Sequence, residues 1–298
     1  MAGYKIFRKI LAIRPDMIVI NTPELLPLAI VNRLFFRRKI MYDILENYYR
    51  NIRHTTVYPL PARWPLALMV RTLEKITAPF MHHFFLAENG YQKEIGFAKP
   101  FTILENKLPK SVAQLYKCKT PRDNHQLLFT GTLAKSTGVF EAIKLSRELH
   151  AIDSRYSLSI IGYCALPDDL AEIKAEIKKS PFISLHGGDR LVPHHEILQA
   201  TSHAGWGIVI YPPNPSTESS IPTKVYEYLA LQLPMIIRHN PQSHEMVKKF
   251  DGGIILPDQF RYYDLANQLK IHPPNSVMSV DVCWESEAPK LIECLRNL

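Results

Sequence analysis

The hydrophobic pattern of this chain alternates between short apolar runs and longer stretches with helical spacing. In residues 3–14, Ile6, Ile10 and Ile13 fall on one helical face, and Pro15 ends that helix. Buried strands are predicted at 17–20, 39–42, 84–87 and 101–104, with helical patterns over 23–36 and 64–81. Such alternation is typical of an α/β protein with parallel sheets.

The second half of the chain continues the alternation. Because 298 residues exceed the ~250 that one core usually serves, we expect two domains, at 1–115 and 118–278, with a last helix at 283–298. The polar residues 110–124 are predicted to be the linker between them. Further strands are predicted at 126–130, 157–161, 182–185, 207–210, after Pro234 and at 254–256, and helices at 139–150, 170–178 and 194–201.

Composition places the chain among globular proteins, since 46% of its residues are apolar and no low-complexity tract is present. Arg, Lys or Pro interrupts every long apolar run, so neither a membrane-spanning helix nor a signal peptide is expected, and the predicted location is cytoplasmic. Neither the cysteines nor the adjacent histidine pairs have metal-ligand spacing, so we expect no metal site. The cysteines also form no paired framework, which fits a reducing compartment. The residues concerned are Cys118, Cys164, Cys283 and Cys294 and the pairs His82-His83 and His194-His195.

Positive charge is concentrated in the first part of the chain. Residues 1–115 carry 17 Lys and Arg against 8 Asp and Glu, within a net charge of +8. This excess indicates an anionic partner, which is a membrane surface, a lipid diphosphate or nucleic acid. Residues 50–83 mix Arg and His with Trp64 and other apolar side chains, which is typical of a membrane-interface or acceptor-docking segment. The alternative is an amphipathic helix packed on the sheet of the first domain.

The stretch from Ser219 to Asn240 predicts a loop, a helix and a buried strand. Pro222 occupies a helix N1 position, so the free N–H groups of the first turn point toward the loop. The residues that predict a phosphate cradle there are Ser219, Ser220, Thr223 and Lys224. Glu227 lies three residues after Lys224, where its carboxylate could accept hydrogen bonds from a ribose diol. The alternative is a surface helix with one ion pair.

This stretch also resembles a known family. PTKVYEYLA followed by LPMI is similar to the donor-binding segment of GT-B glycosyltransferases, especially the retaining, family 4-like group. The resemblance implies an α/β fold of two Rossmann-like domains facing a cleft, with Glu227 at the ribose and the preceding loop at the diphosphate. Ser219 stands where the family has a first Glu, and Gln232 where it has Gly. The first domain is expected to be incomplete, because the family's opening strand and Gly-rich loop have no counterpart here.

A glycine-bracketed loop at 131–138 lies between a predicted strand and helix, which is a weak phosphate-binding signal by itself. It resembles the family's G-R-L-x-x-x-K-G, with Thr132 in place of Arg and Thr137 in place of Lys. The resemblance therefore implies donor binding by Gly131, Thr132 and Lys135 beside Lys224. It also implies that the base lies near Asp189 and Arg190, where the alternative is an ordinary turn at Gly187-Gly188.

The first domain resembles the family at NTPELLP and YDILENYYR. Asn21 and Thr22 stand where the family has a His-Asp pair, and Leu45 where it has His, whereas Glu24, Asp43 and Glu46 remain. The catalytic candidates are Asp43 and Glu46. The Trp-Glu start of the last helix resembles the family's closing helix, which crosses back onto the first domain.

The function that the resemblance implies is transfer of a sugar from a nucleotide diphosphate sugar to a carbohydrate or lipid-linked acceptor, in polysaccharide or glycolipid assembly. No metal and no cofactor are expected, and the basic half predicts a place at the inner face of a membrane. The alternative is a catalytically impaired nucleotide-sugar-binding or scaffold protein of the same fold. A nucleic-acid binder is a third reading, but no motif supports it.

Overall fold

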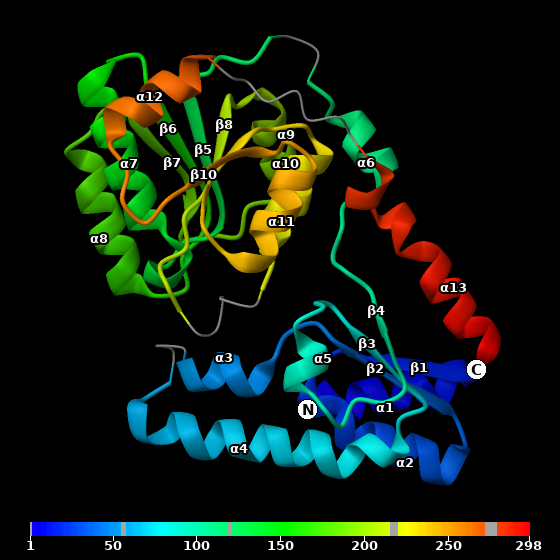
Figure 1. The fold of residues 1–298 in the computed structure, drawn as a ribbon. Helices are drawn as coiled ribbons and strands as arrows, with labels where there is room; N and C mark the ends of the chain where they lie inside the picture. The colour runs from blue at the N-terminus through cyan, green and yellow to red at the C-terminus, as the bar shows by residue number, and fades with distance from the viewer. Residues whose placement is uncertain (1, 55–57, 119–120, 215–219, 272–278) are drawn as a thin grey trace. The chain divides into compact units, whose positions relative to one another are not determined.

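The computed structural model describes residues 2–298 except 55–57, 119–120, 215–219 and 272–278 (Figure 1). The chain divides into two compact units. The N-unit comprises Met1–Asn106 and Glu287–Leu298, and the C-unit comprises Lys107–Ser286. The division lies between residues 106 and 107, earlier than the boundary expected at 115.

The N-unit contains a four-stranded parallel sheet in the order β1-β2-β3-β4, in which each strand is the neighbour of the next in sequence. Its strands are β1 (Met17–Ile20), β2 (Lys39–Ile44), β3 (His83–Leu86) and β4 (Phe101–Ile103). Its helices are α1 (Ala2–Ile13), α2 (Leu26–Phe36), α3 (Tyr48–His54), α4 (Leu60–Thr77), α5 (Tyr91–Glu94) and α13 (Ala288–Asn297), with 3-10 turns η1 (Pro23–Leu25) and η2 (Ala78–Phe80).

The two faces of this sheet have different covers. Helices α2, α4 and α5 pack on one face, where Tyr42 and Phe84 are fully buried. Helix α13 packs on the other face, where Cys294 meets Met41 and Phe85. Residues from the two ends of the N-unit's sequence therefore share one core.

The C-unit contains a six-stranded parallel sheet in the order β10-β9-β8-β5-β6-β7. Its strands are β5 (Gln126–Thr132), β6 (Ser157–Tyr163), β7 (Ile183–Gly188), β8 (Trp206–Val209), β9 (Met235–Arg238) and β10 (Gly253–Leu256). Its helices are α6 (Lys110–Leu115), α7 (Val139–Ile152), α8 (Pro167–Lys178), α9 (His194–His203), α10 (Thr223–Ala230), α11 (Pro241–Lys249) and α12 (Tyr262–Ile271), with 3-10 turns η3 (Lys135–Thr137), η4 (Val280–Val282) and η5 (Trp284–Ser286).

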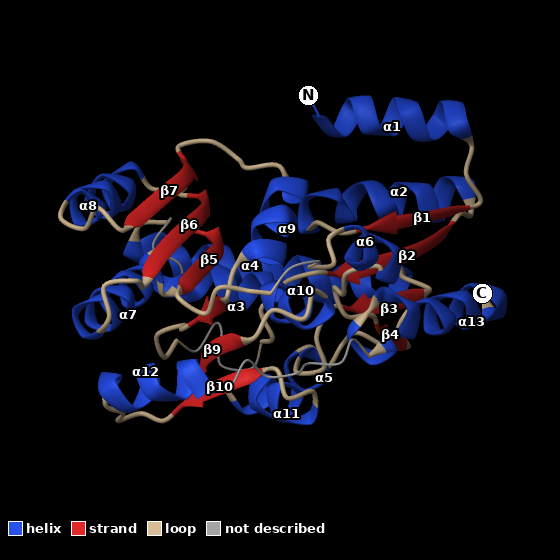
Figure 2. Cartoon of the chain, turned by 90° about the horizontal axis from the view of Figure 1, so that it is seen from above, coloured by secondary structure: helices blue, strands red, loops and turns tan. Residues whose placement is uncertain are grey.

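Helices cover both faces of the six-stranded sheet. Helices α7, α8 and α12 lie on one face and α9, α10 and α11 on the other (Figures 1 and 2). Because both faces are covered, the strands carry continuous apolar runs, and Trp206 and Phe129 have no exposed surface. This arrangement of two parallel sheets confirms the α/β class predicted from the sequence.

The predicted linker differs from the structure. Residues 110–115 form α6 within the C-unit, after Pro109, which lies at the helix N-cap. Val112, Ala113 and Tyr116 pack on the face that α9 and α10 cover. Their helical spacing was hidden among lysines and glutamine, which made the segment look like a linker.

Arg122 fastens two helices that reach the candidate site. Its guanidinium donates hydrogen bonds to the carbonyls of Thr201 and Ala204 at the end of α9, at 2.9 and 2.6 Å. It also donates to the Leu231 carbonyl at the end of α10, at 2.8 Å. One side chain therefore satisfies the carbonyls that two helix ends leave open and fixes α9 relative to α10.

Candidate functional site

The candidate site lies in the C-unit, at the edge of the sheet where its parallel strands end. Strands β5 and β8 end here, and α10 begins here after the N-cap residue Pro222. Open α/β sheets bind ligands at this edge, because loops and helix N-termini converge on it. The edge therefore brings together the 131–138 loop and the first turn of α10.

Lys224 is the most unusual side chain at this edge. Only 7% of its surface is exposed, and its Nζ has no hydrogen-bond partner among the described residues. The amine lies 4.1 Å from the centre of the Phe129 ring and 5.4 Å from that of Tyr211. Burial lowers the pKa of Lys224 to about 7, although the Glu227 carboxylate partly opposes the shift. A buried amine without an anionic partner is poised to bind an anion.

Gly131 lies next to that amine. Its φ is +101°, and a Cβ added there would lie 3.7 Å from Lys224 Cε and 3.8 Å from Nζ. Those distances are ordinary van der Waals contacts, so the lysine side chain lies directly against the loop, and it is the positive φ at this position that favours glycine. Gly131 and Lys224, both predicted to bind the donor, are brought together by the fold.

Lys135 has a different neighbourhood. Its Nζ lies 2.7 Å from Glu172 Oε2 and 3.8 Å from Asp169 Oδ1, both on α8. The hydrogen bond to Glu172 raises the pKa of Lys135. The charge of Lys135 is therefore engaged by carboxylates of a neighbouring helix, and 61% of the side chain is exposed.

The loop itself is held by Thr137 rather than by charge. The Thr137 hydroxyl lies 2.7 Å from the Thr132 carbonyl oxygen and 3.0 Å from that of Ala134, either of which can accept its single hydrogen, and it accepts from the Ala134 N–H. The loop closes at Gly138, whose φ is +85° and whose hypothetical Cβ would lie 1.8 Å from the Ile210 carbonyl oxygen. The close approach to Ile210 places the start of α7 beside the end of β8.

Glu227 already has a partner that the sequence did not suggest. The imidazole Nε2 of His194 lies 2.8 Å from Glu227 Oε1, and this hydrogen bond raises the pKa of His194. The Glu227 side chain is only 12% exposed, so its second oxygen faces a restricted space. His194 is the first residue of α9, and its place beside Glu227 depends on the packing of α9 against α10.

The other predicted donor-binding residues are less enclosed. Asp189 and Arg190 follow β7 after two glycines with φ of +89° and +82°, and both side chains are exposed. Thr223, the first residue of α10, is exposed and Ser220 is half-buried. Ser219 lies outside the described residues.

The catalytic candidates lie in the N-unit, at the corresponding edge of its own sheet. Asp43 belongs to β2 and is half-buried, and burial raises the pKa of its carboxyl to about 6. Glu46 follows the strand, is exposed and accepts a hydrogen bond from Asn51 Nδ2 at 3.0 Å.

A polar network that the sequence did not reveal lies near these carboxylates. Arg71 on α4 donates to Asn47 Oδ1 at 2.6 Å and pairs with the buried Glu74, which also accepts from the Tyr42 hydroxyl. Asn47 donates to Glu94, which pairs with Arg50 at 2.8 Å. The network fixes the chain that leaves β2. No group of three or more His, Cys, Asp or Glu suited to a metal ion occurs among the described residues.

Comparisons with known proteins give a clear answer only at the level of structure. No family model matches the chain, and no curated protein matches it either. A structure of HepE from Anabaena, in complex with UDP and glucose, matches with a TM-score of 0.70 and 14% identity, over 99% of this chain and 81% of that chain.

Two further enzymes match in the same way. Sucrose-phosphate synthase from Thermosynechococcus elongatus has a TM-score of 0.69 and 16% identity, over 99% of this chain and 77% of that one. The catalytic domain of starch synthase IV from Arabidopsis thaliana, bound to ADP and acarbose, has a TM-score of 0.65 and 11% identity, over 97% and 74%. At these identities the likeness is one of fold, and the chain has the GT-B fold of glycosyltransferases, as its sequence predicted.

Burial of Lys224 without a partner leads to a prediction about stability. Below pH 7 the amine is charged in both folded and unfolded chains, so its desolvation cost is complete, and this cost shrinks as pH rises toward 10. Lys224→Met should therefore raise the free energy of unfolding of the ligand-free protein by about 1–4 kcal/mol at pH 7 and below, and by less at pH 9. Chemical denaturation across this pH range measures the difference.

Lys135→Met is the matched control, because that amine is exposed and should change stability little. If the Lys224→Met variant is less stable than the wild type at pH 6, the interpretation of Lys224 as a buried amine without a partner is wrong.

Proposed function

We propose that this protein is a glycosyltransferase that takes a sugar from a nucleotide diphosphate sugar and transfers it to a carbohydrate or lipid-linked acceptor. The observation that carries the proposal is the unpartnered Nζ of Lys224, buried at the N-terminus of α10 and beside Gly131. A diphosphate would supply the missing anionic partner. When the bond to the sugar breaks, the leaving diphosphate gains negative charge, which a fixed cation and helix N–H groups stabilise.

In this proposal, Lys224 balances most of the negative charge of the diphosphate. Lys135 is paired with Glu172, and Thr132 brings no charge. The helix dipole alone supplies roughly half an elementary charge, whereas a charge-assisted hydrogen bond is about twice as strong as a neutral one. Lysine and helix together would meet the leaving-group charge without a metal, which is the mode we propose, and we assign the enzyme to the retaining, family 4-like group.

The nucleoside end of the donor is assigned to Glu227. Its carboxylate lies one turn along α10 from Lys224, which suits a ribose next to a diphosphate. His194 Nε2 holds one carboxylate oxygen, so the other can accept from a ribose hydroxyl. Asp189 and Arg190 lie at the end of β7, where the base would be placed.

Titration with nucleoside, nucleoside monophosphate and nucleoside diphosphate tests the assignment of these two side chains. Lys224→Met should weaken the diphosphate at least tenfold and leave the nucleoside unchanged, because only phosphate meets the amine. Glu227→Ala should weaken all three ligands by ~1–3 kcal/mol, because the ribose hydroxyls lose a charged acceptor. Calorimetry with uridine, guanosine and adenosine ligands measures both effects and identifies the base.

Lys135→Met serves as the control and should change none of the affinities. The pH dependence adds a second readout: affinity for a nucleotide sugar should fall as pH rises above about 7, by at most tenfold per pH unit, because the bound form requires the protonated amine. An equal loss for all three ligands in Lys224→Met would assign that residue to the helix rather than to the phosphate.

We assign to Asp43 the role of the base that accepts a proton from the acceptor hydroxyl, with Glu46 as the second carboxylate of this edge. A carboxylate whose pKa is about 6 is ionised at neutral pH and basic enough to accept a hydroxyl proton from the acceptor. Sugar transfer should therefore fall as pH decreases below about 6, and Asp43→Asn should lower kcat by about 100-fold or more, with nucleotide binding unchanged. A coupled assay for released nucleoside diphosphate measures the rate.

Asp16→Asn, an exposed change in the same unit, is the control for this experiment. The alternative function, a nucleotide-sugar-binding or scaffold protein, is favoured by Asn21, Thr22 and Leu45 at positions where the family has other residues. Tight binding of nucleotide sugar with no transfer to any carbohydrate or lipid-linked acceptor would support that alternative.

We also propose that the N-unit contacts the cytoplasmic face of a membrane during polysaccharide or glycolipid assembly. One face of α4 is packed, whereas Leu60, Trp64 and Met69 on this helix are 75%, 56% and 59% exposed. Helix α1 exposes Lys5 and other basic residues. Exposed apolar side chains and exposed positive charge in one unit suit an anionic interface. No helix of the described part of the chain is long and apolar enough to span a bilayer.

Co-sedimentation with vesicles tests this contact. Binding should require anionic lipid and weaken with salt, and Trp64→Ser should reduce it several-fold through lost apolar insertion. Leu191→Ser changes a residue of the C-unit that is 78% exposed and is the matched control. Equal binding to neutral and anionic vesicles, or no binding at all, would contradict the proposal.

A further inference from the structure

We infer that the sugar of the donor carries a carboxylate, which Arg238 binds in a cavity beside the start of α10. The inference rests on the proposed function and extends it from nucleotide sugars in general to nucleotide-activated uronic acids. Three features support it: a cavity, the guanidinium of Arg238, which has no ion pair with a described residue, and the buried hydroxyl of Ser243, which has no hydrogen-bond partner among them.

The cavity has a volume of about 530 Å³ and lies between the chain that leaves β8 and the chain that leaves β9. Such a volume accommodates a sugar. Tyr211, whose ring contacts the amine of Lys224, forms part of its wall, and so does Pro222 at the N-cap of α10. The cavity therefore begins where the proposed diphosphate site ends.

The order of groups along this edge matches the order of groups in a nucleotide sugar. Glu227 lies inside α10, Lys224 in its first turn, and the cavity beyond Pro222. A donor with its ribose at Glu227 and its diphosphate at Lys224 would place the sugar in the cavity. The cavity is thus assigned to the transferred sugar and not to the nucleoside.

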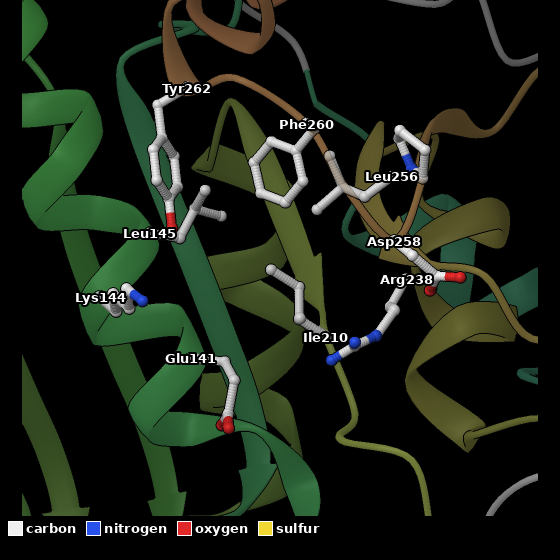
Figure 3. Close-up of a pocket in the computed structure, with 10 residues that line it drawn as sticks. Glu141, Lys144, Leu145, Ile210, Arg238, Leu256, Asp258, Phe260 and Tyr262 are labelled. Atoms are coloured by element: carbon white, nitrogen blue, oxygen red, sulfur yellow. The ribbon is translucent and has the colours of Figure 1, made fainter.

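Arg238, the last residue of β9, supplies positive charge to this cavity. Its guanidinium forms no ion pair or hydrogen bond with any described residue, although it also lines a smaller cavity of about 160 Å³ with Glu141 and Asp258 (Figure 3). Asp258 lines both cavities but is exposed, so water weakens its influence on the guanidinium, and the half-buried Glu141 lines only the smaller cavity. Arginine presents two parallel N–H donors that match a carboxylate, a geometry that a neutral hydroxymethyl group cannot use.

Ser243 supplies a second polar group. The residue has no exposed surface, lines the cavity and has a hydroxyl without a hydrogen-bond partner among the described residues. Its N–H donates to Asn240 Oδ1 at 3.2 Å, so the cap of α11 is complete without the hydroxyl. Buried hydroxyls are rarely unpaired, and we assign a ligand oxygen as the partner of this one. Because Ser243 has no exposed surface in the free protein, the wall of the cavity must shift for the two to meet.

The test compares a neutral and a carboxylated sugar on the same nucleotide, chosen as whichever of UDP, GDP and ADP binds. With UDP the pair is UDP-glucose and UDP-glucuronic acid, titrated by calorimetry. The wild type should bind the carboxylated donor at least tenfold more tightly. Arg238→Gln should bring the ratio close to one and leave affinity for UDP unchanged. Ser243→Ala should weaken both sugar nucleotides several-fold relative to UDP.

The Ser243→Ala variant should fold normally, because the hydroxyl that it lacks has no partner among the described residues. It therefore keeps the test informative if Arg238→Gln is unstable. Arg261→Gln is the matched control, since that side chain is 82% exposed and pairs with Asp264. Equal affinity of the wild type for both sugars, or an unchanged ratio in Arg238→Gln, would overturn the inference while nucleotide binding upholds the proposed function. If no nucleotide binds, the proposed function fails and the inference fails with it.

Discussion

The buried amine of Lys224 is the interaction on which the candidate site depends. Phe129, Tyr211 and the backbone of Gly131 surround it, and its Nζ forms no hydrogen bond with any described residue. Burial without a partner costs stability in the free protein. Such a cost is expected where a side chain serves binding, because the same desolvation that weakens the fold strengthens attraction to an incoming anion.

The geometry of parallel sheets explains how distant residues meet at this edge. Strands β5, β8 and β9 lie side by side, although 73 residues lie between β5 and β8 and 25 between β8 and β9, and all point the same way. Their exits therefore deliver Gly131, Tyr211 and Arg238 to one edge. Arg122 secures the opposite ends of α9 and α10, so the pair formed by His194 and Glu227 relies on a side chain that binds no ligand.

Local pattern was sufficient for much of the fold and for part of the site. The apolar runs predicted the strands, and the proline before Thr223 predicted a helix start at the position where Lys224 is found. Helix α6 was missed because its apolar residues are few and lie among lysines, and only packing against the C-unit selects a helix there.

Side-chain partners were less predictable than elements. The position of Lys135 in the loop predicts that it binds phosphate, yet its neighbours Glu172 and Asp169 come from a helix more than 30 residues away. The spacing of the His194-His195 pair concerns metal ligation alone, and nothing in it indicates that His194 meets Glu227. Contacts of this kind depend on how helices pack across a sheet, which hydrophobic spacing does not specify.

The discontinuous N-unit has a consequence for synthesis. Its sheet emerges from the ribosome before the C-unit, but the face that holds Met41 and Phe85 is covered by α13, which is made after the C-unit. The C-unit is continuous in sequence and can fold as soon as its own residues have left the ribosome. The N-unit must therefore wait with an uncovered apolar face, and it reaches its final packing after the unit that follows it in the chain.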